Sequence, residues 1–474
     1  MKRSITNKLG AESAGLIHPK DVKFNSGESP SEPTVAIIGG GASGVLAAVR
    51  LLESPEARAG KFRVRLIERR SSTGRGVAYG TESPFHLLNV RQSQMSAYPE
   101  NSEHFARWVA RTNSGEMKNA FQPRHRYADY LSFLLAEAAR AAPGFSSMIG
   151  EVRDFARRED GRTEIHLSGG AIFVCDRLIL ATGHRSPGTP EGLREVSPSA
   201  RFIADPWEPG KTAAIGKNER VLIVGSGLTT VDLVMSRFRA GHLAPIEVLS
   251  RHGLAPLGHS AVEAELPRGF TLPEGTAREI FRGLRSAAAA AKDAWPAVID
   301  RFRAEVYRVW QSWPESERRR FLRHARAYWE IHRHRVAPEV HREWDLYLRG
   351  GKTRITAGRI LSATEAGDGF HVKIAERGGV VREKIYDRIV NCTGAAPDLS
   401  VLDGHGYLTD PLRIGIPTDS AGRPFQANGE IDPRVFIFGP ALRTRFWEMT
   451  AIPDLRGQAK VLAEAVIASL TSSP

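Results

Sequence analysis

Two apolar runs of similar pattern lie far apart along the chain, and each leads through glycine-rich sequence into helix-like periodicity. The first unit covers residues 34–52 around the glycine stretch 39–44, and the second covers 220–238 around 225–230. Short runs rich in β-branched residues indicate buried strands, and apolar residues spaced three or four apart indicate helices. Each unit therefore predicts a strand, a tight turn and a helix.

Both units are followed, much later, by another apolar strand that ends in Thr-Gly, at 176–183 and at 387–394. An internal repeat of this kind predicts an α/β fold with two doubly wound, Rossmann-like dinucleotide-binding domains. The tail supplies a further apolar strand at 435–438 and a helical pattern at 457–470. We therefore expect the second domain to be inserted in the first.

The domain boundaries follow from these patterns. We expect the first domain at 34–212 and 397–474, and the second at 213–396. Residues 275–348 carry a long helical pattern and are too long for a simple crossover, so they predict a helical insertion in the second domain. Residues 1–33 are polar and lack periodicity, which predicts a disordered leader.

Composition narrows the class of protein. The chain has 474 residues, 41% of them hydrophobic and 25% charged, which is typical of a globular protein of more than one domain. No secretory signal or apolar run of membrane-spanning length is present, so we expect a cytoplasmic protein. The net charge of +13 is not accompanied by a basic tail or interleaved aromatic motif, which argues against a nucleic-acid partner.

Candidate metal and thiol chemistry is poorly supported. The two cysteines, Cys175 and Cys392, are far apart and form neither a dithiol motif nor a metal-ligand spacing. The insertion holds four histidines among many arginines, without a cysteine or carboxylate at a recognised spacing. We expect no bound metal and interpret this region as an amphipathic helix with a basic face, whose arginines could also attract an acidic substrate or NADPH phosphates.

The first glycine stretch matches the dinucleotide-binding pattern G-x-G-x-x-G. Gly39 allows the turn, Gly41 lets a pyrophosphate approach the backbone, and Gly44 lets the helix pack closely on the strand. Glu68 ends the next predicted strand, where a carboxylate accepts hydrogen bonds from a ribose and repels a 2′-phosphate. This favours FAD. The FAD contacts expected in this unit are Gly39, Gly41, Ala42, Ser43, Gly44, Glu68, Arg69, Thr182 and Gly183.

The second glycine stretch departs from the pattern at one position, because Thr230 replaces the third glycine. Arg251 follows the next predicted strand, where the first unit has Glu68, and an arginine there can pair with a 2′-phosphate. We therefore expect NADPH, with NADH as an alternative and a merely solvated Arg251 as the simpler interpretation. The expected contacts are Gly225, Gly227, Leu228, Thr229, Thr230, Arg251, Thr393 and Gly394.

Over residues 34–470 the chain resembles the two-dinucleotide-domain flavoproteins, which include flavin monooxygenases and disulfide reductases. The strings GRGVAYG at 74–80 and HLLNV at 86–90 are similar to those of an FAD/NAD(P)-binding group related to the flavin-dependent N-hydroxylating monooxygenases. This resemblance implies that a segment of residues lies along the isoalloxazine: Gly76, Tyr79, Leu88, Asn89, Val90 and Met95. Asn89 is the expected catalytic residue, since its amide can donate a hydrogen bond to the flavin or its oxygen adduct. The alternative is an asparagine that caps a turn.

The C-terminal part of the chain departs from the sequence pattern of related flavoproteins. Related flavoproteins often have Gly-Asp near the ribityl chain, whereas this chain has Gly439 followed by Pro440. Gly439 is still expected to approach the cofactor. Residues 450–456 contain Pro453 and precede a predicted helix, whose first amides could face the pyrimidine edge of reduced flavin.

The missing C-x-x-C motif argues against the disulfide-reductase branch, which passes electrons through paired thiols. The resemblance then implies a monooxygenase in which NADPH reduces FAD and O₂ is activated as a C4a-flavin adduct. The expected substrate is small, and our specific hypothesis is N-hydroxylation of an amino-acid-like amine. Two alternatives stay open: a flavin reductase or dehydrogenase that serves a small acceptor or partner protein, and a non-catalytic redox-sensing flavoprotein.

Overall fold

The first sheet is parallel and holds the strand that precedes the first glycine stretch. In the computed structural model, which describes residues 16–17, 32–70, 72–112, 119–260, 265–266 and 269–471, its strand order is β1-β4-β3-β2-β8-β16. The strands are β1 (Leu16–Ile17), β2 (Thr34–Ile38), β3 (Arg63–Glu68), β4 (Phe145–Ile149), β8 (Arg177–Leu180) and β16 (Val435–Ile437). Residues of β2 such as Val35 and Ile37 are fully buried because both faces of the sheet are covered.

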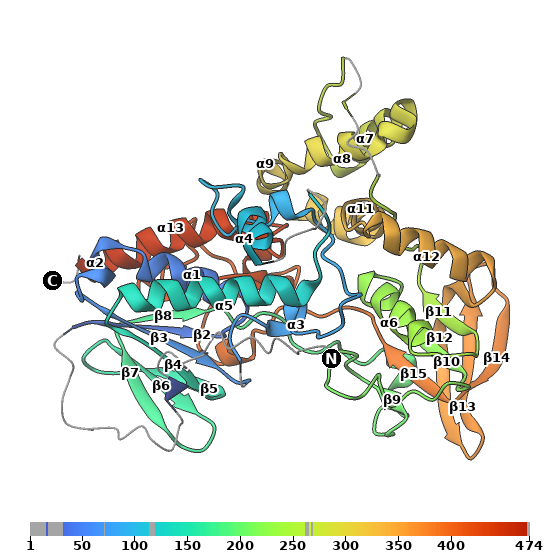
Figure 1. Ribbon diagram of the computed structural model, residues 1–474, viewed down its shortest axis with the longest axis horizontal. Coiled ribbons are helices and arrows are strands. Elements are labelled where there is room, and N and C mark those ends of the chain that lie inside the picture. The colour runs from blue at the N-terminus through green and yellow to red at the C-terminus, as the bar shows by residue number, and fades with distance from the viewer. Residues whose placement is uncertain are drawn as a thin grey trace, which may run out of the picture.

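Helices cover one face of this sheet, and a small antiparallel sheet lies on the other (Figure 1). The helices are α1 (Ala42–Leu52), α5 (Arg124–Ala141) and α13 (Ile452–Thr471), and the small sheet is β5 (Val152–Arg157), β6 (Thr163–Leu167) and β7 (Ile172–Cys175). Shorter helices complete this domain: α2 (Pro55–Arg58), α3 (Gly76–Tyr79), η1 (Gln92–Gln94), α4 (His104–Thr112), η5 (Ser400–Leu402) and η6 (Pro440–Thr444).

The second sheet repeats this plan, with parallel strands in its centre and an antiparallel extension at one edge. Its order is β14-β13-β12-β11-β10-β15-β9. The strands are β9 (Phe202–Ile203), β10 (Val221–Val224), β11 (Ile246–Ser250), β12 (Thr353–Ala366), β13 (Gly369–Glu376), β14 (Val381–Tyr386) and β15 (Arg388–Asn391). Helix α6 (Leu228–Arg239) follows the second glycine stretch and packs against α12 (Pro338–Arg349), and η2 (Glu191–Leu193) packs on β12.

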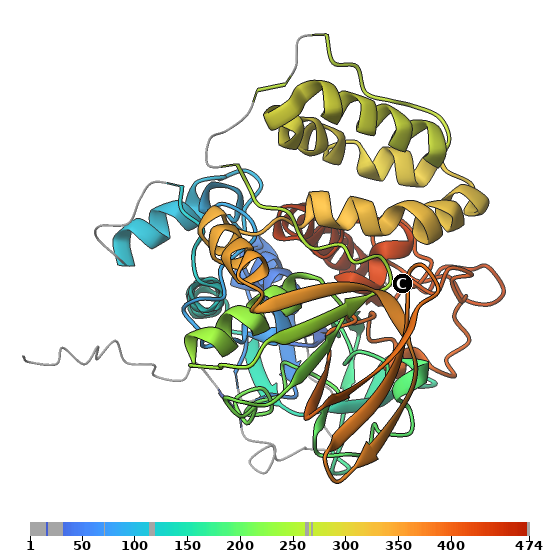
Figure 2. The ribbon, with the colours of Figure 1, turned by 90° about the vertical axis from the view of Figure 1, so that its right-hand side faces the viewer.

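Most of the predicted insertion forms a separate helical layer, which Figure 2 shows above both sheets. Its helices are α7 (Ala277–Ala291), η3 (Lys292–Ala294), α8 (Trp295–Arg303), α9 (Val306–Ser312), α10 (Glu315–Arg320), the π-helical η4 (Phe321–Ala325) and α11 (Arg326–Arg333). They bury a core of their own around Trp310 and Trp329, to which Trp447 of the first domain contributes. The last helix of the predicted insertion, α12, instead packs on the second sheet through Val340 and Trp344.

The repeat and the nested order of the domains are confirmed, because β16 returns to pair with β8 of the first sheet. The boundary predicted at residue 212 is too late, since β9 pairs with β15 of the second sheet. A strand of two residues is too short to produce a recognisable pattern. Helix α13 likewise begins at Ile452, earlier than the predicted residue 457.

The predicted leader lies mostly outside the described residues. Its residues Leu16–Ile17 are an exception to the predicted disorder, because they form β1 and pair in parallel with Ser147 and Met148 of β4. Among the described residues, no helix is both long and apolar enough to cross a membrane.

Candidate cofactor and active site

The turn between β2 and α1 leaves no room for side chains. Gly39 has a φ of +101°, and a Cβ there would lie 2.3 Å from the Ala181 carbonyl oxygen. A Cβ on Gly44 would lie 1.8 Å from the Gly39 carbonyl oxygen. The first amides of α1 therefore face open space beside β8, where a helix N-terminus favours an anion.

Glu68 holds the end of β3 against this turn. Its Oε2 accepts a hydrogen bond from the Gly40 amide at 2.7 Å, and its Oε1 accepts one from the Arg70 amide at 2.9 Å. The residue is only 8% exposed, so its carboxylate is fixed in place. Each oxygen keeps a further lone pair for a ribose hydroxyl.

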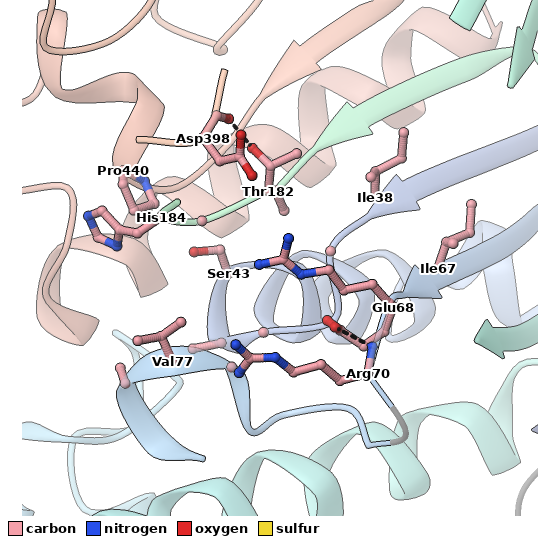
Figure 3. Close-up of a pocket in the computed structure, with 18 of the residues that line it drawn as sticks. Ile38, Ser43, Ile67, Glu68, Arg70, Val77, Thr182, His184, Asp398 and Pro440 are labelled. Atoms are coloured by element: carbon pink, nitrogen blue, oxygen red, sulfur yellow. Dashed lines mark hydrogen bonds between the residues drawn. The ribbon is translucent and has the colours of Figure 1, made fainter. Parts of the chain in front are cut away.

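A cavity of about 330 Å³ runs along the carboxyl edge of the first sheet. Figure 3 shows Glu68 and Arg70 toward one end of it, and His184 and Pro440 toward the other. Thr182 lies between them, and its hydroxyl donates to the Asp398 carbonyl oxygen at 2.6 Å. The predicted residues that line this cavity are Gly39, Gly41, Ala42, Ser43, Glu68, Arg69, Gly76, Tyr79, Thr182 and Gly183.

Sequence reasoning missed further residues of the wall. They are Arg70, Arg75, Glu151, Arg153, His184, Asp398, Pro440, Thr450 and Leu455, among others. The arginines add positive charge to the cavity wall, where Arg75 pairs with Asp129 and Arg153 pairs with Glu151. Burial and the charge of Arg443 lower the pKa of His184 to about 4, so its imidazole is neutral at pH 7. Arg153, Pro440 and Leu455 lie in β5, η6 and α13, and the other residues lie in loops, which leave no periodic signal in a sequence.

The second glycine turn has the same geometry as the first. Gly225 has a φ of +105°, and a Cβ there would lie 2.2 Å from the Cys392 carbonyl oxygen. Thr230 is buried, and its hydroxyl donates to the Gly225 carbonyl oxygen at 2.7 Å. A Cβ on Gly227 would meet nothing within 4 Å, so the turn is open to a ligand.

Comparison with known proteins also indicates that the chain binds dinucleotides. Residues 36–185 match a family profile described as FAD-NAD(P)-binding, and residues 112–271 match one described as L-lysine 6-monooxygenase/L-ornithine 5-monooxygenase. An uncharacterized protein of Mycobacterium tuberculosis is 23% identical over 527 aligned positions, which cover 93% of this chain and 96% of that protein.

Two solved structures share the whole architecture. The ornithine N-hydroxylase of Kutzneria sp. 744 superposes with a TM-score of 0.63 at 16% identity, covering 92% of this chain and 99% of that one. The L-lysine 6-monooxygenase of Pseudomonas syringae gives the same TM-score and identity, with 92% and 100% coverage. Through the two profile matches the chain is similar to the FAD/NAD(P)-binding flavoproteins.

The profile matches support an FAD-dependent oxidoreductase with FAD and NADPH as its cofactors. The first cavity fits FAD on its own geometry. The turn at Gly41 would receive the pyrophosphate at the N-terminus of α1, and Glu68 would accept hydrogen bonds from the adenosine ribose. Among the described residues, no group of three or more His, Cys, Asp or Glu side chains is arranged to hold a metal ion.

The HLLNV segment packs beside the FAD cavity in the protein core, and its expected place along the isoalloxazine stays a prediction. Leu88, Val90 and Met95 are buried in the core of the FAD domain and do not line the cavity. Asn89 is half-buried, and its carbonyl oxygen contacts His259 Nε2 of the NADPH domain at 2.9 Å. The segment connects the two domains, so hydrophobic packing fixes its orientation. The role of the Asn89 side chain at the flavin remains a prediction.

The remaining predicted residues lie near the two sites. Gly439 packs against the first turn of α1, since a Cβ there would lie 2.6 Å from Ser43 Oγ, and its neighbour Pro440 lines the cavity. Pro453 stands in the first turn of α13, beside the lining residue Ile452. The expected NADPH contacts at the ends of β11 and β15 are solvent-exposed: Arg251, Thr393 and Gly394.

The two domains are held together by a buried polar contact. Arg124 of α5 pairs with Asp232 of α6 at 2.7 Å, and both side chains are largely buried. Beside them, His86 contacts the Thr81 hydroxyl through Nδ1 and the Ser236 hydroxyl of α6 through Nε2, each at 2.6 Å. The glycine turn of the NADPH domain is thereby fixed relative to the FAD cavity.

Proposed function

We propose that this flavoprotein is a monooxygenase that hydroxylates the amine nitrogen of a small, amino-acid-like substrate. The balanced reaction consumes NADPH, a proton, O₂ and the amine, and yields NADP⁺, water and the hydroxylamine. The observation that carries the proposal is that one chain holds a cavity at its first dinucleotide-binding turn, a second such turn, and cysteines that are both buried. The match of residues 112–271 to the lysine and ornithine monooxygenase profile supports it.

The cysteines argue against electron transfer through thiols. Cys175 ends β7 in the FAD domain, and Cys392 follows β15 in the other domain. Both are buried and unpaired by disulfides, and burial raises the pKa of each thiol to about 12. A disulfide reductase needs a thiolate that forms readily next to the flavin, and neither cysteine meets this requirement.

The chain would bind and shield rather than supply acid–base groups. Bound FAD would accept hydride from NADPH and activate O₂. The first turn of α1 would hold the pyrophosphate, and Glu68 the ribose. Neutral His184 and Pro440 would close the opposite end of the cavity without adding a charge. Neither residue offers a carboxylate that would stabilise a protonated amine, and the reaction requires the unprotonated amine as its nucleophile.

The test measures coupling in the FAD-loaded enzyme. NADPH oxidation, O₂ uptake, hydrogen peroxide and hydroxylamine products would be quantified with a panel of amino acids and diamines. We expect one class of amine to yield hydroxylamine in proportion to NADPH consumed, with little peroxide. Peroxide equal to NADPH consumed with every amine would contradict the proposal and favour the flavin reductase. A purified protein without flavin would contradict both.

A further inference from the structure

The helical insertion meets the FAD domain along a seam that is rich in arginine. We define the seam by α8, α11, the adjoining residues 334–335 and the segment 440–456. Four of its arginines are matched by carboxylates: Arg303 by Asp454, Arg326 by Glu330, Arg333 by Glu448 and Arg335 by Asp300. Both members of the Arg333 pair are buried, and Trp329 Nε1 also donates to Glu448 at 2.9 Å. The Arg303 and Arg333 pairs attach the insertion to the FAD domain, and the other two pairs lie within the insertion.

Arg443 is the exception. Within the part of the chain that the structure describes, its guanidinium has no hydrogen-bond or ion-pair partner, and its Nε is buried without one. It stacks on the ring of Trp447, with Cζ at 4.1 Å from the ring centroid. The residue as a whole is half-buried, so part of the guanidinium stays accessible to a small molecule.

An unmatched cation in such surroundings has a cost. Burial and the neighbouring charge of Arg326 lower the pKa of Arg443 to about 10, against the smaller opposing effects of Glu330 and Glu448, and it stays charged at neutral pH. Placing a charge in a poorly solvated site without a directly bonded carboxylate opposes folding. A site of this kind is stabilised when an anionic ligand binds.

The position of Arg443 links the FAD cavity to the insertion. It lies in η6, three residues after Pro440, which lines the cavity. On one side its charge acts on His184 of the cavity wall, and on the other it acts on Glu330 and His334 at the insertion. Arg443 does not itself line the FAD cavity. It therefore lies next to the cofactor without being one of its phosphate contacts.

We propose that Arg443 binds the carboxylate of the substrate while its guanidinium rests on the ring of Trp447. The substrate amine would then extend toward the bound flavin. This inference rests on the proposed function. A planar guanidinium held flat against an aromatic ring can offer two parallel N–H donors to a carboxylate. The enzyme would then select amines that carry a carboxylate over the corresponding diamines.

The first test uses the unaltered, FAD-loaded protein. The flavin absorbance spectrum would be recorded while ornithine, lysine, aspartate, glutamate and 2,4-diaminobutyrate are added, and putrescine and cadaverine would serve as matched amines without the carboxylate. We expect at least one amino acid to perturb the spectrum at concentrations about ten-fold or more below those its diamine needs. Equal responses, or no response to any amino acid, would overturn the proposal.

The second test uses three variants. Arg443→Met should raise the dissociation constant and KM of the responding amino acid about ten-fold or more, and Arg443→Lys should restore part of the loss because it keeps the charge. Arg445→Met is the matched control, since Arg445 lies two residues away and donates to the Thr418 carbonyl oxygen. FAD content and the rate of flavin reduction by NADPH should be unchanged in all three.

The two proposals fail in different ways. Amino-acid binding that depends on Arg443 but yields only peroxide would overturn the monooxygenase and leave the carboxylate site standing. Hydroxylamine formation with the same KM in Arg443→Met would overturn the carboxylate site and leave the monooxygenase standing. Loss of FAD or slower flavin reduction in Arg443→Met would assign Arg443 to the cofactor, and so would also overturn the carboxylate site.

Discussion

Gly44 and Thr230 occupy equivalent positions in the two glycine turns and solve the same packing problem differently. At Gly44 the helix approaches so closely that a Cβ would meet the Gly39 carbonyl oxygen at 1.8 Å. At Thr230 a side chain fits, and its hydroxyl donates to the equivalent carbonyl oxygen, that of Gly225. The FAD turn is thus the tighter of the two, as expected for a cofactor that stays bound.

This difference predicts unequal tolerance of a methyl group. Gly44→Ala should empty the protein of FAD and lower its Tm by several degrees, because the clash is with rigid backbone and overpacking costs about 1–3 kcal/mol. Gly227→Ala is the matched control, since its Cβ would meet nothing within 4 Å. It should keep FAD content and Tm and weaken only NADPH binding. Flavin absorbance and thermal unfolding would measure both, and normal FAD binding in Gly44→Ala would refute the expectation.

At the scale of elements, α6 connects the two domains. Its N-terminal turn forms the NADPH site, and its side chains Asp232 and Ser236 contact Arg124 and His86 of the FAD domain. At its far end Arg239 pairs with Glu343 of α12, within its own domain. The helix therefore carries one buried pair between domains and one more exposed pair within a domain.

Removing one partner from each pair should have different effects. Asp232→Ala leaves Arg124 buried without a counter-ion, and we expect a loss of about 3–5 kcal/mol in the free energy of unfolding. Glu343→Ala disrupts a pair whose side chains are 29% and 25% exposed, and should cost about 1 kcal/mol or less. Urea unfolding followed by tryptophan fluorescence would compare them. Equal losses would show that α6 does not depend on the buried pair.

For the whole molecule, histidines at the domain contacts make stability depend on pH. Burial lowers the pKa of His259, which contacts Asn89, and of His184, which lines the cavity, from 6.5 to about 4, and it also lowers the pKa of His86. The unfolded chain then binds protons before the folded one as the pH falls. The contribution of these groups to stability is complete above pH 6.5 and is lost as the pH falls toward about 4.

His259→Gln should weaken this acid sensitivity, because an amide still donates to the Asn89 carbonyl oxygen but does not titrate. The free energy of unfolding would be measured between pH 7.5 and 4.5, a range of about three units around the histidine pKa. His371→Gln is a control of opposite sign. Asp368 raises the pKa of His371, so its contribution is present below pH 6.5 and lost as the pH rises. An unchanged acid slope in His259→Gln would contradict the assignment.

The local pattern of residues was enough to predict the two strand–turn–helix units, their nested order and one half of the FAD cavity. The strand periodicity, the G-x-G-x-x-G motif and Glu68 can all be recognised within a few dozen residues. This is possible because neighbouring residues in the chain decide where a strand, a turn and a helix N-terminus form. The predicted lining residues Gly39, Gly41, Ala42, Ser43, Glu68 and Arg69 belong to this class, whereas Gly76 and Tyr79 were expected from the family resemblance.

Only the tertiary structure decided which segments from distant parts of the chain share a site. It brought His184, Asp398 and Pro440 to the same cavity, directed the HLLNV segment into the core and the domain contact, and placed Arg443 between the cavity wall and the insertion. These positions depend on packing between elements more than 100 residues apart. No periodicity records such packing, because the contacts that fix it are made by side chains that are not neighbours in sequence.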